Sequence, residues 1–350
     1  MAGALSAFYK PIHTMQEKAA RAFHFLLLPE FSMMGFVSAL EPLRVANRFK
    51  KDAYQWKILS WDGQAVQASN GMSLNVDGAL REATAIETLF VVAGFNPLQY
   101  YHRELGDCLR QWERSGATLG ALDTGAFLLA QARLLQGHRV TLHWEAQLAF
   151  QERYPAIEVT DELFEWGDKR ISCAGGPAAM DMMLALIGKA HGLELAATVS
   201  EQFVHGPMRS PSEHQRTQLT ARYGVHNKKL VQVIQAMETH LEDLLSADDL
   251  ASGIGVTRRQ MERLFHTHLG TSPAQFYLVL RMDRARQLLE QTQMGVMAVG
   301  LACGFGASSH FSRAYKQRFG VSPNHDRIAK RVSTHATHTI RQATSLKIRR

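Results

Sequence analysis

Cysteine is scarce in this chain of 350 residues, which contains only Cys108, Cys173 and Cys303. The three are far apart and form no Cys-x-x-Cys pair, which argues against a disulfide framework and against a cysteine-rich zinc site. The sequence also lacks an apolar run long enough to cross a bilayer, and it does not begin with a secretory signal. We therefore expect a cytoplasmic protein without a membrane segment, a metal site or a cofactor.

Acidic and basic residues are divided unevenly along the chain. Residues 1–210 contain 19 Lys and Arg against 22 Asp and Glu, a net charge of −3. Residues 211–350 contain 20 against 10, a net charge of +10. A basic excess confined to one part of a chain is typical of proteins that bind nucleic acid phosphates. This part is therefore the expected site of contact with double-stranded DNA.

The first two hundred residues alternate short apolar runs with amphipathic segments. Expected strands are 23–28, 54–61, 88–93, 117–122, 140–143, 157–159, 163–166 and 170–174. Expected helices are 33–49, 101–114, 125–135, 146–154 and 177–191. Strands that alternate with helices predict an α/β fold, with a parallel sheet covered on both faces.

A pattern near the C-terminus occurs twice, fifty residues apart. Arg263 is followed by Phe265 and Gly270-Thr271-Ser272-Pro273, and Arg313 is followed by Tyr315 and Gly320-Val321-Ser322-Pro323. Each copy predicts two helices joined by a glycine-containing turn. The expected helices are 228–245, then 247–252 and 257–269 in the first unit, and 296–302 and 308–319 in the second. Asp248 is expected to stabilise the start of the first unit by accepting from free N–H groups.

The second helix of each unit has one apolar face and one polar face. In the first unit the polar side chains are Arg258, Arg259, Gln260, Glu262 and Arg263. In the second unit they are Ser308, Ser309, His310, Ser312, Arg313 and Lys316. A short helix of this kind suits the major groove of DNA. The sequence thus predicts an all-α domain with two helix-turn-helix units.

On these motifs, residues 228–327 resemble the AraC/XylS-type DNA-binding domain, including the helix over 274–289 between the units. The resemblance implies that both second helices enter the major groove on one side of the DNA. It implies that Arg263 and Arg313 read bases, while Arg258 and Lys316 contact phosphates. Gly300 stands where the family usually has alanine, and glycine weakens a helix. A looser second unit is therefore expected.

One group of residues in the first domain is a candidate ligand site. The strand over 117–122 leads directly into Asp123-Thr124-Gly125 and a helix, so Asp123 should project into the crevice at the carboxyl end of the sheet. Attacking residues of nucleophile-elbow enzymes occupy such a turn. The residues expected around this crevice are Gly94, Phe95, Asp123, Thr124, His143 and Trp144.

Residues 22–195 resemble the PfpI-like, class I glutamine amidotransferase-like domain, through 91–94, 123–126, His143-Trp144 and 174–176. The resemblance implies a flavodoxin-like parallel sheet. Catalytic relatives have a cysteine where this chain has Asp123, and their supporting acidic residue falls at Gly35. Both substitutions remove the expected nucleophile chemistry. We therefore expect a sensor domain that is not an enzyme.

Together the two resemblances indicate the GlxA-like group of AraC-type regulators. The segment 38–47 is similar to regulators of glycine betaine, carnitine and arginine catabolism. This implies a ligand-responsive activator of a catabolic operon that works as a homodimer with RNA polymerase. A cationic effector could bind the Asp123 carboxylate and lie against Trp144 through a cation–π contact.

Several alternatives are consistent with the same residues. Asp123 could cap the following helix, and His143 and Trp144 could be core or dimer contacts. The whole chain could be an amidase-like enzyme fused to a DNA-binding domain, or a nucleoid-type protein with general DNA affinity. The expected boundaries are a leader (1–21), a sensor domain (22–199), a linker (200–227), a DNA-binding domain (228–327) and a basic disordered tail (328–350).

Overall fold

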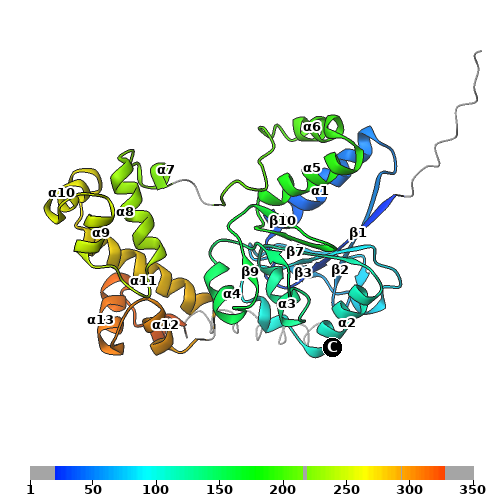
Figure 1. Cartoon of the computed structure of the whole chain (residues 1–350). Coiled ribbons are helices and arrows are strands. Elements are labelled where there is room, and N and C mark those ends of the chain that lie inside the picture. Colours follow the sequence, from blue (N-terminus) through cyan, green and yellow to red (C-terminus); the bar gives the residue numbers. More distant parts are fainter. Residues whose placement is uncertain (1–19, 216–218, 293, 328–350) are drawn as a thin grey trace, which may run out of the picture.

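A seven-stranded sheet forms the centre of the first domain of this computed structural model, which describes residues 20–215, 219–292 and 294–327 (Figure 1). The strand order is β10-β11-β7-β6-β1-β2-β5, parallel except for β10. The strands are β1 (Arg21–Leu27), β2 (Tyr54–Ser60), β5 (Gly78–Ala79), β6 (Thr88–Val92), β7 (Thr118–Leu122), β10 (Phe164–Trp166) and β11 (Arg170–Cys173). This confirms the predicted α/β class and parallel sheet.

Helices cover both faces of the sheet because its central strands are apolar on both sides. Phe25 packs in a core with α1 (Met33–Phe49) and α5 (Ala178–His191). The next residue, Leu26, points to the opposite face and a core with α2 (Arg103–Arg114) and α3 (Ala126–Gln131). Both side chains are fully buried, as expected where successive residues of a strand alternate between two covered faces.

Two local expectations in the first domain are wrong. The helix predicted over 125–135 is a 3-10 turn, η3 (Asp123–Gly125), followed by the short α3. The strand predicted over 140–143 is only β8 (Arg139–Val140), which pairs with β9 (Glu158–Val159) outside the main sheet. Beyond β8, the Thr141 backbone N–H donates to the Ser172 hydroxyl. The chain therefore continues as a loop to α4 (Gln147–Arg153).

Sequence periodicity also missed several elements, mostly because they are short. These are β3 (Val66–Gln67), β4 (Ser73–Leu74), β5, η1 (Leu80–Glu82), η2 (Pro97–Tyr100), α6 (Leu193–Gln202) and α7 (Leu219–Tyr223). The predicted leader and tail lie almost wholly outside the described residues, and β1 already begins at Arg21.

The second domain is all-helical, as predicted, with two helix-turn-helix units joined by a long helix. Its helices are α8 (Lys228–Thr239), α9 (Ala247–Gly253), α10 (Arg258–Leu269), α11 (Pro273–Gln291), α12 (Val296–Ala302) and α13 (Ser308–Phe319). The helix predicted over 228–245 ends at Thr239. The first unit is capped by Ser246 and Asp249, which form a reciprocal capping box, so the expected role of Asp248 is wrong.

The repeated Gly-x-Ser-Pro motif ends one helix and begins the next. Gly270 and Gly320 have φ of 64° and 76°, a left-handed conformation that terminates α10 and α13. Ser272 then caps α11, because its hydroxyl accepts from the Gln275 N–H, and Ser322 accepts likewise from the His325 N–H. The repeat is thus explained by helix capping chemistry.

Gly300 does not create the expected looseness around its helix. A Cβ atom at this position would lie 3.2 Å from the ring of Phe311. Phe311 is fully buried against α12, so the glycine permits a close helix approach. Arg281 of α11 further fixes this unit, since its guanidinium donates to the carbonyls of Cys303 and Gly304 and stacks on Phe305.

Much of the predicted linker is attached to the first domain. We call residues 203–215 the strap. The carboxylate of Asp181, which is completely buried, accepts from the Arg209 backbone N–H and from two nitrogens of its guanidinium, at 2.6–3.0 Å. His205 lies 3.2 Å from the same carboxylate. The strap is therefore fixed to α5 by a buried ionic network.

Asp181→Asn should lower the stability of the first domain. The change keeps the shape of the side chain but removes the charge that binds Arg209, and hydrogen bonds to charged groups are worth about 1.5–3 kcal/mol. The melting temperature should fall clearly in scanning calorimetry. Asp107→Asn breaks the exposed pair with Arg110 at 2.6 Å and should leave the melting temperature nearly unchanged. Equal melting temperatures for both variants would contradict the structural role of Asp181.

Candidate functional site

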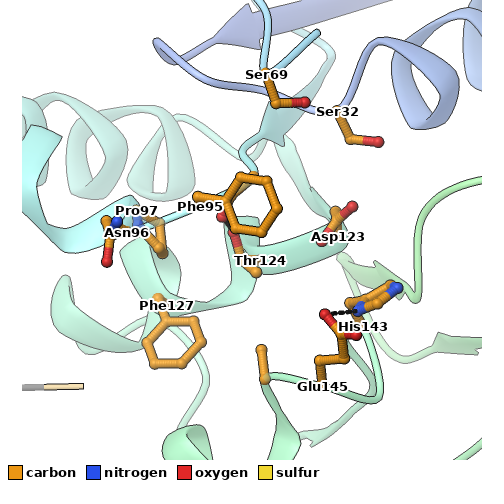
Figure 2. Close-up of a pocket in the computed structure, with 12 residues that line it drawn as sticks. Ser32, Ser69, Phe95, Asn96, Pro97, Asp123, Thr124, Phe127, His143 and Glu145 are labelled. Atoms are coloured by element: carbon orange, nitrogen blue, oxygen red, sulfur yellow. Dashed lines mark hydrogen bonds and ion pairs between the residues drawn. The ribbon is translucent and has the colours of Figure 1, made fainter. Parts of the chain in front are cut away.

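A pocket of about 140 Å³ opens at the carboxyl ends of β6 and β7 (Figure 2). This is the edge of a parallel sheet where ligands commonly bind. The lining residues are Ser32, Ser69, Gly94, Phe95, Asn96, Pro97, Asp123, Thr124, Phe127, His143, Glu145 and Ala146. Five of the six predicted ligand residues line the pocket, and Trp144 does not.

Asp123 lies at a sharp turn that the surrounding backbone enforces. Its φ of 60° is left-handed, which is uncommon for a residue other than glycine. A Cβ atom on Gly125 would lie 2.1 Å from the Val91 carbonyl oxygen, and one on Gly175 would lie 2.8 Å from the Asp123 Cβ. Only glycine fits at both positions, so close packing on two sides holds the Asp123 carboxyl at the pocket wall.

The Asp123 carboxyl is surrounded by groups that act on its charge. Burial, with a smaller contribution from the nearby Glu145 carboxylate, raises the pKa of this carboxyl to about 7. Hydrogen bonds from the Ser32 hydroxyl and the Thr124 N–H act in the opposite direction. Figure 2 shows Asp123 between Ser32 and His143 at the pocket. A substantial share of Asp123 is therefore protonated at neutral pH.

Helix capping does not explain Asp123. The N-cap of α3 is Gly125, and no side chain caps this helix. Instead, Ser32 reaches the carboxyl while its oxygen also caps α1, accepting from the Gly35 N–H at 3.2 Å. Ser32 was not anticipated from the sequence, because it lies 91 positions before Asp123.

His143 and Glu145 form the side of the pocket that belongs to the loop between β8 and α4. The His143 Nδ1 atom lies 4.0 Å from a Glu145 carboxylate oxygen, and both side chains are partly exposed. Burial lowers the pKa of His143, against the opposing effect of Glu145. Trp144 packs beside the His143 ring, with the ring centroids 5.7 Å apart. Trp144 is half-buried and does not line the pocket.

Phe95 and Thr124 have different roles at the pocket. The Phe95 side chain is 60% exposed, although it is large and apolar, so its ring is available to a ligand. The Thr124 hydroxyl donates to the Gly94 carbonyl and so joins the ends of the two strands. Phe95 is thus open to a ligand, whereas Thr124 already has a structural partner.

No residue of the pocket wall is a thiol. The Cys173 side chain behind Asp123 is fully buried, and burial raises the pKa of this thiol to about 12. A thiol of that kind is unreactive at neutral pH. The pocket therefore combines two carboxyl groups, an exposed aromatic ring and several hydroxyl groups. These groups suit recognition of a cation.

The two second helices of the helix-turn-helix units, α10 and α13, present the predicted polar residues. Every one of these side chains is exposed except that of Ser312, which is half-buried. Met261 and Phe265 on α10, and Phe311 and Tyr315 on α13, are fully buried on the opposite sides. The predicted division of each helix into an apolar and a polar face is confirmed.

Some of the polar residues on α10 already have partners within the helix. The Arg258 guanidinium donates to Glu262 at 3.0 Å. The Gln260 side chain accepts from the Thr257 N–H at 2.9 Å as part of a capping box. No partner among the described residues is recorded for Arg259 and Arg263. These two arginines are therefore the α10 side chains most available to DNA.

Comparisons with known proteins connect both domains to described families. The DJ-1/PfpI family model matches residues 24–189, and a helix-turn-helix domain model matches residues 250–328. Along the chain, 305 residues are 58% identical to the HTH-type transcriptional regulator CdhR of Pseudomonas aeruginosa, covering 87% of this chain and 91% of that protein.

Two further regulators match over most of their length. GbdR of Pseudomonas aeruginosa is 40% identical over 320 residues, covering 91% of this chain and 87% of that protein. GlxA of Rhizobium meliloti is 34% identical over 301 residues, covering 85% and 93%. These relatives are named as transcriptional regulators, which agrees with the prediction that the chain is not an enzyme. Within the described ranges, no helix has the length and apolar character needed to span a membrane.

The raised pKa of Asp123 should make stability depend on pH. Its folded-state pKa of about 7 lies above the ordinary value of 3.8, so the folded protein binds more protons between these values than the unfolded chain. The contribution of Asp123 to stability is thus present below about pH 4 and is lost as the pH rises to 7. The Asp123→Asn variant has no carboxyl group at this position, so it does not lose this stability as the pH rises. Its melting temperature relative to wild type should rise between pH 4 and pH 8, and a constant difference would contradict the raised pKa.

Proposed function

The chain belongs to the AraC-type transcriptional regulators that carry a DJ-1/PfpI domain, and we propose that the pocket at Asp123 is the effector site of this ligand-responsive, DNA-binding regulator. The family membership rests on relatives that match over most of their length. The assignment of the site rests chiefly on Asp123, a carboxyl group held at the wall of a small pocket by close backbone packing.

We propose a small cationic or zwitterionic effector such as glycine betaine, carnitine or arginine. A cation beside Asp123 would favour its ionised form and would release the proton of the carboxyl group. Glu145 adds a second negative group, and Phe95 offers the face of an aromatic ring to the cation. The hydroxyl group of Ser69, which also lines the pocket, is a possible donor for the carboxylate end of a zwitterion.

For the DNA-binding domain, we propose that Arg263 and Arg313 read bases in two successive segments of the major groove. Both are exposed and occupy equivalent positions on α10 and α13. Arg259, Glu262, Ser309, His310 and Ser312 lie around them in supporting positions. Arg258 and Lys316 are proposed phosphate contacts, which position the domain without reading sequence.

The proposed setting is an activator of a catabolic operon in the cytoplasm. A homodimer would place two DNA-binding domains on paired half-sites, since the spacing of half-sites follows the symmetry of the protein. Contact with RNA polymerase would then convert operator binding into activation. Both partners are supported by the resemblance to the family.

Asp123→Asn should abolish the effector response while the protein still folds and binds its operator. Wild-type protein should bind a member of the panel glycine betaine, carnitine and arginine in calorimetry, more tightly at pH 8 than at pH 6 because Asp123 ionises between them. The variant should bind at least about tenfold more weakly, because it loses the attraction between opposite charges, which is about 4 kcal/mol for two unit charges about 4 Å apart near a protein surface.

Asp107→Asn serves as a matched control for this experiment, because Asp107 lies on α2 away from the pocket lining. It should keep wild-type affinity. Unchanged affinity of Asp123→Asn would remove Asp123 from the effector site. If no panel member bound wild-type protein, the proposed effector class would be wrong.

Arg263→Ala should relax base preference at one position of the operator. A bidentate arginine on guanine is worth about 1–3 kcal/mol of discrimination between bases. Competition binding with operators selected from random DNA would measure this preference. Arg258→Ala is the matched control, and it should weaken all sequences alike and lower the salt slope by about one. A uniform loss for Arg263→Ala would assign that residue to phosphate contact.

A further inference from the structure

The loop after β8 lies between the pocket and the DNA-binding domain. His143, Glu145 and Ala146 of this loop line the pocket. The two residues before His143, Thr141 and Leu142, are fully buried, and the residues after Ala146 form α4. A ligand that contacts His143 or Glu145 would therefore act directly on this loop, which makes two further contacts outside the pocket.

The first of these contacts is made by Gln215, the final residue of the strap. Its side-chain nitrogen lies within 3.0 Å of the Thr141 hydroxyl, the Leu142 carbonyl and the Glu162 carbonyl. The Gln215 backbone N–H also donates to the Asp161 carbonyl at 3.3 Å. Gln215 is thus anchored to the backbone that leads into the pocket wall.

Gln215 is also close to the start of the second domain along the chain. The first described helix after it, α7, begins at Leu219. At full extension, the four residue steps from Gln215 to Leu219 span at most about 14 Å. A shift of Gln215 would therefore change the position from which the DNA-binding domain is tethered.

The second contact is made by α4 itself. The Glu152 carboxylate lies 3.8 Å from the guanidinium of Arg284 on α11, and both side chains are largely covered. Phe150 of α4 belongs to the same continuous apolar cluster as Met282 and Ala285 of α11. Figure 1 shows the end of α11 beside α4. Since α11 joins the two helix-turn-helix units, this contact connects the loop to the helix that sets their spacing.

From these two contacts we propose that residues 141–152 relay occupancy of the pocket to the DNA-binding domain, through Gln215 and through the Glu152–Arg284 pair. This proposal rests on the pocket being the effector site. Gln215, Glu152 and Arg284 are positioning residues in it, because none of them lines the pocket or lies on α10 or α13. A ligand that displaces the loop would move the tether and the α4 contact together.

Coupling between two sites is reciprocal, so DNA binding must also act on the loop. Hydrogen exchange of the full-length protein, with and without an operator duplex selected from random DNA, tests this without an effector. Operator binding should change the exchange of residues 141–147 in wild-type protein. Gln215→Ala and Glu152→Gln should each reduce that change by at least half. Unchanged exchange in wild type, or a full change in both variants, would overturn the proposal.

Matched controls keep the same chemistry away from the relay. Gln67→Ala removes a side-chain hydrogen bond to the Gly71 carbonyl in the hairpin beside the pocket. Glu41→Gln breaks a pair with Arg44 on α1, a helix that packs on the opposite face of the sheet from α4. Both should retain the full exchange response. A loss in these controls equal to that in Gln215→Ala would show general loosening, which would contradict a specific relay.

A second measurement separates this proposal from the assignment of the effector site. With the panel member that binds wild-type protein, Gln215→Ala should keep the dissociation constant and lose the effect of the ligand on operator affinity. Equal losses of ligand affinity and operator response would place Gln215 in the binding site itself. Absence of binding by glycine betaine, carnitine and arginine would concern the effector class alone, because the exchange experiment contains no effector.

Discussion

The close approach of the η3 backbone to β6 is the constraint on which the pocket depends. Gly125 lies so near the Val91 carbonyl that any side chain would collide with it, and Gly175 closes on Asp123 from β11. This packing keeps Asp123 in a left-handed conformation and fixes its carboxyl at the pocket wall. The same geometry would expose a nucleophile in an enzyme. Here it holds a carboxyl group at the wall of the pocket.

Burial at this turn raises the pKa of the Asp123 carboxyl into the range where a nearby charge changes its ionisation. A group whose pKa lies near 7 changes its ionisation in response to a single nearby charge. The loop that carries His143 and Glu145 contributes the second side of the pocket and is itself held by Gln215 and extended by α4. One segment of chain therefore both lines the pocket and contacts α11 of the DNA-binding domain.

The two parts of the chain carry net charges of opposite sign. The first has slightly more acidic than basic residues, and the second part of the chain is strongly basic. In the helical domain, buried aromatic residues such as Phe265 and Tyr315 hold each short helix in place, while arginines remain on its outer face. The contact of the largely buried Arg284 with Glu152 shows that some basic residues of this domain serve packing, whereas Arg259 and Arg263 are exposed on α10.

The sequence by itself determined the features that are local along the chain. Alternating apolar runs predicted the parallel sheet, the repeated Gly-x-Ser-Pro motif predicted two similar helical units, and the strand leading into Asp123 predicted the turn at the pocket. Tertiary structure alone decided which distant residues meet there. Ser32 reaches Asp123, Gln215 binds Leu142 and Arg284 approaches Glu152, and each pair is separated by 70 or more positions. Such contacts follow from strand order and domain packing, which periodicity and spacing do not encode.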